Sequence, residues 1–128
     1  IKAREIVQQL CVDNVRVLDA FEKSLIGTIN IKEFRSLITF IQHFANGGNP
    51  GNKLKYLKNN NVQTEYEFRS KHLRIYAVQE PNHKLVVFCG IKKAADSKDN
   101  IEAFRRINSH FKESLKPKKN DKARTNNK

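Results

Sequence analysis

Two short arginine-bearing segments contain the residues best suited to chemistry in this chain of 128 residues: YEFR at residues 66–69 and LRIY at residues 73–76. Apolar and polar residues alternate in both segments, which predicts two β-strands joined as a hairpin by residues 70–72. On paired strands Arg69 and Arg74 would face the same side. Two planar, permanently charged guanidinium groups in that arrangement are suited to holding one phosphate.

The chemistry that such a pair would support is cleavage of RNA without a metal. This reaction needs a group that takes the proton of a ribose 2′-OH, cations that stabilise the added negative charge at phosphorus, and an acid for the departing 5′ oxygen. Its product would be a 2′,3′-cyclic phosphate. Arg69 and Arg74 are the candidate cations. The alternative for Arg69 is an ordinary surface ion pair with Glu67 or Glu65.

Five lysines flank the predicted hairpin in sequence. Lys53, Lys55 and Lys58 precede it, and Lys92 and Lys93 end the next predicted strand. These ammonium groups would either clamp the phosphates of a substrate or exchange a proton with it. The alternative is that they are solvated residues at the ends of strands.

Two further side chains near the hairpin have a possible role. His72, in the predicted turn, is a candidate proton shuttle, and the alternative is an ordinary turn residue. Tyr76 could stack on an unpaired base, as aromatic side chains do in many RNA-binding proteins, or could complete the sheet.

The rest of the chain predicts an α+β fold: a small twisted antiparallel sheet with N-terminal helices and a C-terminal helix packed on one face. Residues 1–13 would form an N-terminal extension, in which Ile6, Val7, Leu10 and Cys11 would share a helical face but would need a packing partner. The other predicted elements are a strand at 15–21, a short helical turn at 22–25, a helix at 31–45 capped by Asn30 and Glu33, strands at 62–69, 73–78 and 84–91, and a helix from Asp99 to Leu115.

This arrangement predicts which side chains of the sheet face the helices and which face the opposite side. If Tyr66, Phe68, Ile75 and Ala77 face the helices, then the intervening residues of both strands project from the opposite side. An uncovered, cationic face with an aromatic residue is the expected result. Residues 14–115 would form the domain, and residues 116–128 would form a disordered basic tail.

Charge and composition narrow the classes of partner. The chain has 25 Lys and Arg against 13 Asp and Glu, a formal net charge of +12. Nucleic acid is the obvious polyanion for such a surface, and added solubility is the alternative explanation. The longest apolar run, residues 85–91, is far shorter than the ~20 residues of a membrane-spanning helix. We therefore expect no contact with a membrane.

Cysteine and histidine usage favours neither a disulfide framework nor a metal. The only cysteines are Cys11 and Cys89, and Cys89 lies in the most apolar stretch, where a thiol usually packs as a small hydrophobic group. A reducing, cytoplasmic compartment is expected. Because no known metal-ligand spacing occurs, we expect no metal and no small-molecule cofactor.

Four segments, taken in order, resemble the pattern of the RelE/HigB superfamily of bacterial toxins, most of all its phage-derived HigB-like branch. They are YEFR at 66–69, LRIY at 73–76, FCGIKK at 88–93 and EAFR at 102–105. The resemblance covers about residues 14–112. It implies a RelE-like fold and an endoribonuclease that cuts messenger RNA, usually on the ribosome. It also implies silencing by a cognate antitoxin, often a helix-turn-helix protein.

The resemblance implies roles for individual residues, but one residue of the family pattern is missing from this chain. Arg69 and Arg74 would stabilise the transition state, Lys53 and Lys55 would match the basic residues ahead of the sheet, and Lys92 and Lys93 would match its basic pair. Many relatives have a Tyr or His just after that pair, whereas residues 94–99 contain neither. The alternative is therefore a catalytically inactive RNA-binding or phage accessory protein with the same fold.

Overall fold

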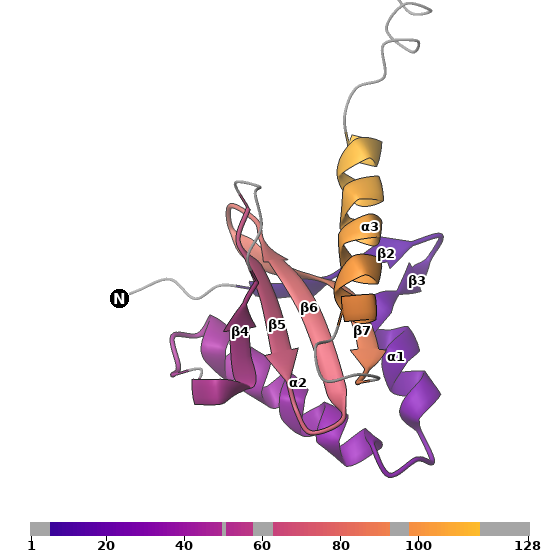
Figure 1. The fold of residues 1–128 in the computed structure, drawn as a ribbon, viewed down its shortest axis with the longest axis vertical. Helices are drawn as coiled ribbons and strands as arrows, with labels where there is room; N and C mark the ends of the chain where they lie inside the picture. The colour runs from indigo at the N-terminus through magenta and orange to yellow at the C-terminus, as the bar shows by residue number, and fades with distance from the viewer. Residues whose placement is uncertain (1–5, 50, 58–62, 93–97, 116–128) are drawn as a thin grey trace, which may run out of the picture.

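The computed structural model describes residues 6–49, 51–57, 63–92 and 98–115. Its fold is α+β, as the sequence predicts, with one mixed sheet of five strands and three α-helices among these residues. In sheet order the strands are β1 (Ile6–Gln9), β7 (His83–Ile91), β6 (Leu73–Gln79), β5 (Glu65–Arg69) and β4 (Leu54–Tyr56). Figure 1 shows the sheet between helices.

The predicted hairpin and central strand are confirmed. β5 and β6 pair antiparallel across the turn at residues 70–72, and β7 pairs with β6 along its other edge. Most of β7 is buried on both faces. A register irregularity between Tyr76 and Ala77 marks a bulge in the pairing of β6 with β7.

The prediction of a purely antiparallel sheet is wrong, because β1 lies parallel to β7, with Val7 opposite Lys84. The helical interpretation of the N-terminal extension is also wrong for residues 6–9. This segment lies on the open edge of β7, where pairing satisfies backbone groups that a short isolated helix could not satisfy as well. A small hairpin follows, formed by β2 (Cys11–Val12) and β3 (Val15–Arg16).

Helices α1 (Val17–Leu25) and α2 (Ile31–Ala45) pack on one face of the sheet. The predicted bounds of α2 are confirmed. The predicted strand at 15–21 is wrong beyond Arg16, because Val17, Phe21 and Leu25 follow helical spacing and pack toward the core. The helix-facing residues of β5 and β6 are also as predicted: Tyr66, Phe68, Ile75 and Ala77 belong to this core.

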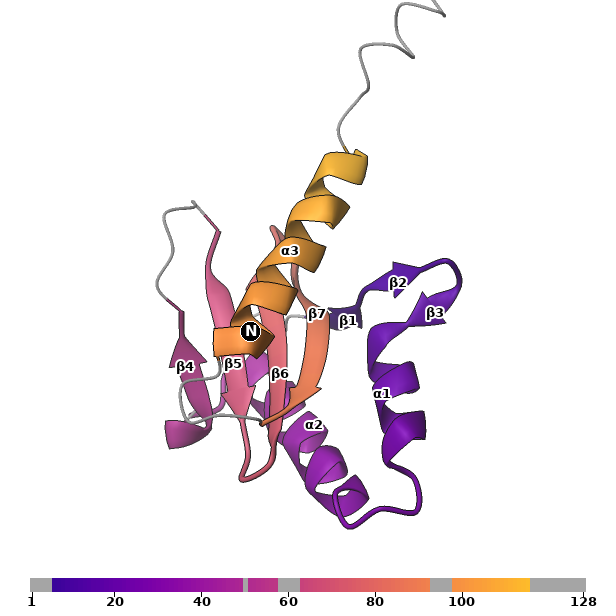
Figure 2. The ribbon, with the colours of Figure 1, turned by 45° about the vertical axis from the view of Figure 1, so that its right-hand side comes forward.

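Helix α3 (Lys98–Leu115) lies on the opposite face, so the prediction that all helices share one face is wrong. It crosses in front of the sheet in Figure 1, and the view in Figure 2 shows α2 behind the strands. Phe104 of α3 is fully buried against Tyr76 and Val78, forming a second core. The face that was expected to be uncovered is therefore partly covered. Among the described residues, no helix is long and apolar enough to cross a membrane.

Candidate functional site

Polar side chains of β4, β5 and β6 form two rows on the α3 face of the sheet. In the first row, Lys55 of β4, Glu67 of β5 and Tyr76 of β6 lie side by side, since each is the register partner of the next. In the second row, Arg69 lies beside Arg74. We call these five residues the α3-side rows. Cross-strand neighbours in such rows are within contact distance.

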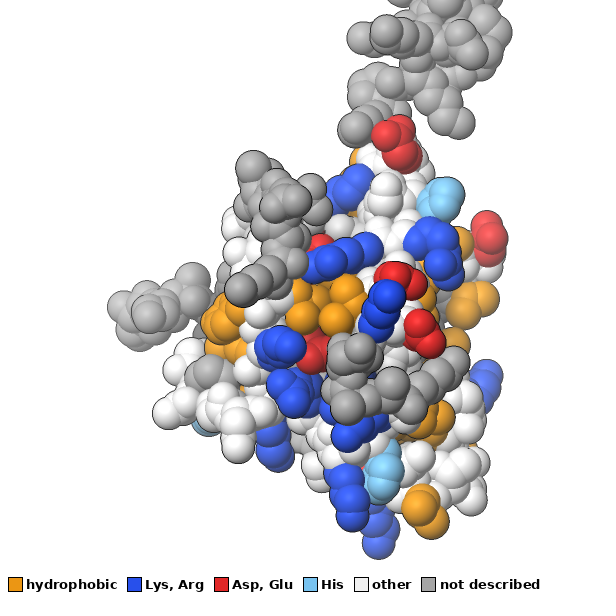
Figure 3. Space-filling view, in the orientation of Figure 1, with side chains coloured by type: hydrophobic (Ala, Val, Ile, Leu, Met, Phe, Trp, Pro, Cys, Tyr) orange, Lys and Arg blue, Asp and Glu red, His pale blue; other side chains and the backbone are white. Residues whose placement is uncertain are grey.

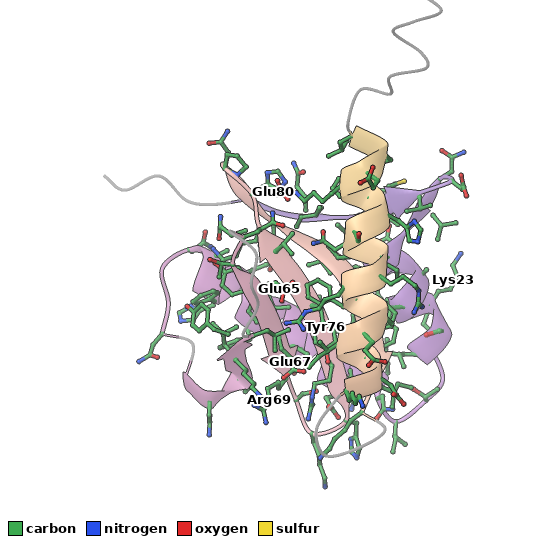
Figure 4. The ribbon with its side chains drawn as sticks, turned by 45° about the horizontal axis from the view of Figure 1, so that its top comes forward. Lys23, Glu65, Glu67, Arg69, Tyr76 and Glu80 are labelled. Carbon is green, nitrogen blue, oxygen red and sulfur yellow. The ribbon has the colours of Figure 1, made fainter. Side chains whose placement is uncertain are left out.

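Glu67 is the carboxylate at the centre of the first row. Its side chain is only 3% exposed, and its Oε2 accepts a hydrogen bond of 2.7 Å from the Tyr76 hydroxyl. Its Oε1 lies 3.9 Å from Nε of Arg69, whose side chain is 42% exposed. Figure 4 shows Glu67 and Tyr76 between the strands and α3, with Arg69 toward the hairpin end. The ion pair that the sequence left as an alternative for Arg69 is thus present.

Arg74 is enclosed rather than projecting into solvent. The residue is 4% exposed, and its Nη1 donates to the backbone carbonyls of Ser70 (2.6 Å) and Leu73 (2.8 Å). Its buried Nε has no hydrogen-bond partner among the described residues, and no carboxylate of that part of the chain pairs with it. Arg74 therefore holds the hairpin, and no described carboxylate forms an ion pair with it.

Tyr76 is also enclosed. It is fully buried, and its ring stacks on Phe104 of α3 with 5.2 Å between centroids. The expectation that it projects from an uncovered face is wrong, because α3 covers that part of the sheet. Its ring cannot stack on a nucleobase in this arrangement. Its hydroxyl, however, stays in the polar row through Glu67.

Lys53 and Lys55, which precede the hairpin in the sequence, do not share a side of the sheet. Lys55 is exposed and lies in the first α3-side row. Lys53 instead lies with its Nζ 5.6 Å from the ring centroid of Phe40, a residue of α2. The structure therefore places Lys55 on the same side of the sheet as Glu67 and Arg69, and Lys53 toward the α2 face.

His72 is held by α2 on the other side of the hairpin. Its backbone N–H donates to Glu33 Oε2 (2.6 Å), and its ring Nδ1 lies 2.9 Å from Glu33 Oε1. The Ser70 hydroxyl also donates to Glu33. Burial by itself would raise the pKa of Glu33, but these hydrogen bonds and the nearby His72 lower it below its ordinary value. The predicted capping of α2 by Asn30 is not formed, and Glu33 binds the hairpin instead.

Lys92 lies at the same end of the sheet as the hairpin. It is exposed, and its backbone N–H donates to the carbonyl of His72 (2.8 Å). Lys58 and Lys93 lie outside the described residues. Figure 3 shows Lys and Arg side chains spread over this face, around a patch where hydrophobic and acidic atoms are visible.

Two ion pairs fasten α3 above the rows. Arg105 donates to Glu65 Oε1 from both Nε (3.1 Å) and Nη2 (2.9 Å). Lys112 binds Glu80 Oε2 at 2.5 Å. Although burial would raise the pKa of Glu80, its hydrogen bonds from Lys112 and Gln63 lower it. These pairs fix α3 at its middle and toward its C-terminal end.

Glu67 is the residue that sequence reasoning missed as a group able to do chemistry. Strand alternation placed it on the same side as Arg69, but it was considered only as the partner of an ion pair. Its burial and its bond to Tyr76 depend on α3, which local sequence does not place. Among the described residues, no group of three or more His, Cys, Asp or Glu side chains is arranged to hold a metal ion.

Comparison with known proteins gives no relative: no known family, no curated protein and no solved structure matches this chain.

Proposed function

We propose that the protein binds single-stranded RNA at the α3-side rows and cleaves it by attack of a ribose 2′-OH on the adjacent phosphorus. The proposed role is that of a RelE/HigB-type toxin acting on messenger RNA at the ribosome and silenced by a cognate antitoxin. The observation that supports it most is the position of Arg69, half-exposed on the same side of the sheet as Lys55 and beside a buried carboxylate and hydroxyl.

Charge favours a phosphate as the occupant. At the surface Arg69 provides a planar guanidinium group and Lys55 provides an ammonium group. Lys92 adds a third cation at the hairpin end of the sheet. Arg74 lies beneath without a carboxylate partner in the described part of the chain, so its field adds to theirs. A buried cation that no anion neutralises is costly to the fold, which is expected where an anion is to be bound.

The test uses an RNA, its DNA counterpart, and the same RNA with a single 2′-deoxynucleotide at the mapped cut. We expect cleavage of the RNA to a 2′,3′-cyclic phosphate and none of the other two. Arg69→Ala should lower the rate by about 10²–10³-fold, as loss of one transition-state donor does. Lys23→Ala is the matched control, since Lys23 is an exposed cation on α1. Messenger RNA on ribosomes and bare RNA should be compared as substrates.

Binding of RNA without cleavage is the second candidate, favoured by the enclosure of Arg74 and by the attachment of His72 to Glu33. It predicts an affinity that falls with salt at about 0.7 log units per phosphate contact for each tenfold rise in salt, and intact RNA at all times. Uncut RNA with wild-type protein, or equal cutting by Arg69→Ala, would reject the nuclease. Arrest of cell growth when the protein is expressed would support the nuclease rather than binding alone.

A further inference from the structure

We infer that Glu67 is the group that takes the proton from the attacking 2′-OH, and that Tyr76 positions it. This inference rests on the proposed nuclease function and names the base that the function needs. It is drawn from the contacts of two carboxylates on one strand, Glu65 and Glu67.

The two carboxylates lie on the same face of β5 and are similarly buried, since each whole residue is 2% exposed. The Glu65 carboxylate is engaged in an ion pair, because its Oε1 accepts two hydrogen bonds from Arg105. This pair attaches α3 to β5. Glu67 has one oxygen occupied, by the Tyr76 hydroxyl. Among the described residues nothing donates a hydrogen bond to its Oε1, which lies toward Arg69. Glu67 therefore keeps an oxygen that can accept a proton.

Tyr76 holds this carboxylate in one orientation. The tyrosine ring is fully buried and stacked on Phe104, so its hydroxyl cannot turn away to water. A carboxylate fixed by one oxygen presents the other in a constant direction, which is what a general base requires. Among the described residues, the charged or titratable groups beside Glu67 on this face are Lys55 on β4, Arg69 on its own strand, and Tyr76 and Arg74 on β6.

The step balances with solvent as the source and the acceptor of the exchanged protons. Glu67 Oε1 takes the proton of the 2′-OH while the 2′ oxygen bonds to phosphorus. The bond from phosphorus to the 5′ oxygen breaks, and that oxygen takes a proton from solvent. Arg69, adjacent to Oε1, compensates the charge that develops on the phosphate oxygens. The products are a 2′,3′-cyclic phosphate and a 5′-hydroxyl, and Glu67 then returns its proton to solvent.

The decisive experiment measures single-turnover cleavage and RNA affinity for Glu67→Gln. The amide keeps the shape and can still accept the Tyr76 hydrogen bond, but it cannot take the proton. We expect the rate to fall by about 10²–10⁴-fold, the usual contribution of a general base, with no loss of RNA affinity. Glu65→Gln is the matched control. It should cut at the wild-type rate per folded molecule, because its carboxylate binds Arg105.

Two further variants keep the inference testable if Glu67→Gln does not fold. Glu67→Asp retains a carboxylate and should recover part of the rate. Tyr76→Phe removes the hydroxyl that holds the Glu67 carboxylate in one orientation, so the single-turnover rate per folded molecule should fall while RNA affinity is kept. A merely structural role for Tyr76 would lower stability and leave that rate unchanged.

The outcomes separate the two proposals. If the wild-type protein cuts RNA and Glu67→Gln cuts at the same rate with the same pH profile, the assignment of the base is overturned and the nuclease stands. If folded Glu67→Gln loses RNA affinity in proportion to rate, Glu67 serves binding and the assignment is likewise overturned. If the wild-type protein cuts no RNA, both proposals fall.

Discussion

Glu33, in the first turn of α2, binds both the backbone N–H and the ring of His72 in the β5–β6 turn, with distances of 2.6 Å and 2.9 Å. These residues are 39 positions apart in the chain. The contact joins the helical layer to the hairpin that bears Arg69. It therefore sets the position of the hairpin end relative to α2.

This contact predicts a dependence of stability on pH. The pKa of Glu33 is lowered in the folded state, so its contribution is present above the unfolded value of roughly 4.3 and is lost as pH falls through the lower folded value. Glu33→Ala should cost about 1–3 kcal/mol of unfolding free energy at pH 7, and less in strong acid. Urea denaturation at several pH values measures this. Glu22→Ala, which breaks an exposed pair with Arg35, should cost less than about 1 kcal/mol.

Arg69 and Arg74 are neighbours in register but should respond differently to mutation. Arg74→Ala leaves hairpin carbonyls short of a buried donor and should lower the free energy of unfolding by about 1–3 kcal/mol. Arg69→Ala loses a long, partly exposed ion pair and should change it by less than about 1 kcal/mol. Thermal and urea unfolding distinguish the two. Equal stability of both variants would contradict the enclosed position of Arg74.

Gly90 gives α3 room to approach β7. A Cβ added to Gly90 would lie 2.5 Å from Oδ1 of Asn100, whose Nδ2 donates to the Ile91 carbonyl. Gly90→Ala should therefore destabilise by about 1–3 kcal/mol through overpacking. Asn100→Ala removes the clashing group, so the double variant should be more stable than the sum of the single effects predicts. Strict additivity would mean that α3 does not contact Gly90.

The two cysteines should react with a thiol reagent at very different rates. Cys11 is exposed, whereas Cys89 is buried, and burial raises the pKa of its thiol far above the ordinary value. Intact mass after brief alkylation of the native protein should show one label, and labelling in denaturant should show two. The Cys11→Ser variant should remain unlabelled while folded. Rapid double labelling of native protein would contradict a closed core around Cys89.

Local patterns in the sequence determined several features of this protein. Helical spacing predicted α2 with its bounds, because its apolar stripe is long and uninterrupted. Alternation predicted the β5–β6 hairpin and the division of its side chains, with Phe68 and Ile75 on one face and Arg69 and Arg74 on the other. These features depend on neighbours a few residues apart, so a single sequence contains the information.

Only the tertiary structure decided which face α3 covers and which arginine reaches solvent. β7 is apolar on both faces, so nothing local indicates the side on which Phe104 packs. That choice encloses Tyr76 against Glu67 and leaves Arg69 at the surface. Tertiary structure also decided the role of Glu33, which binds the β5–β6 hairpin instead of capping α2. Each outcome depends on residues far apart in the chain that meet only after folding, which short-range periodicity cannot represent.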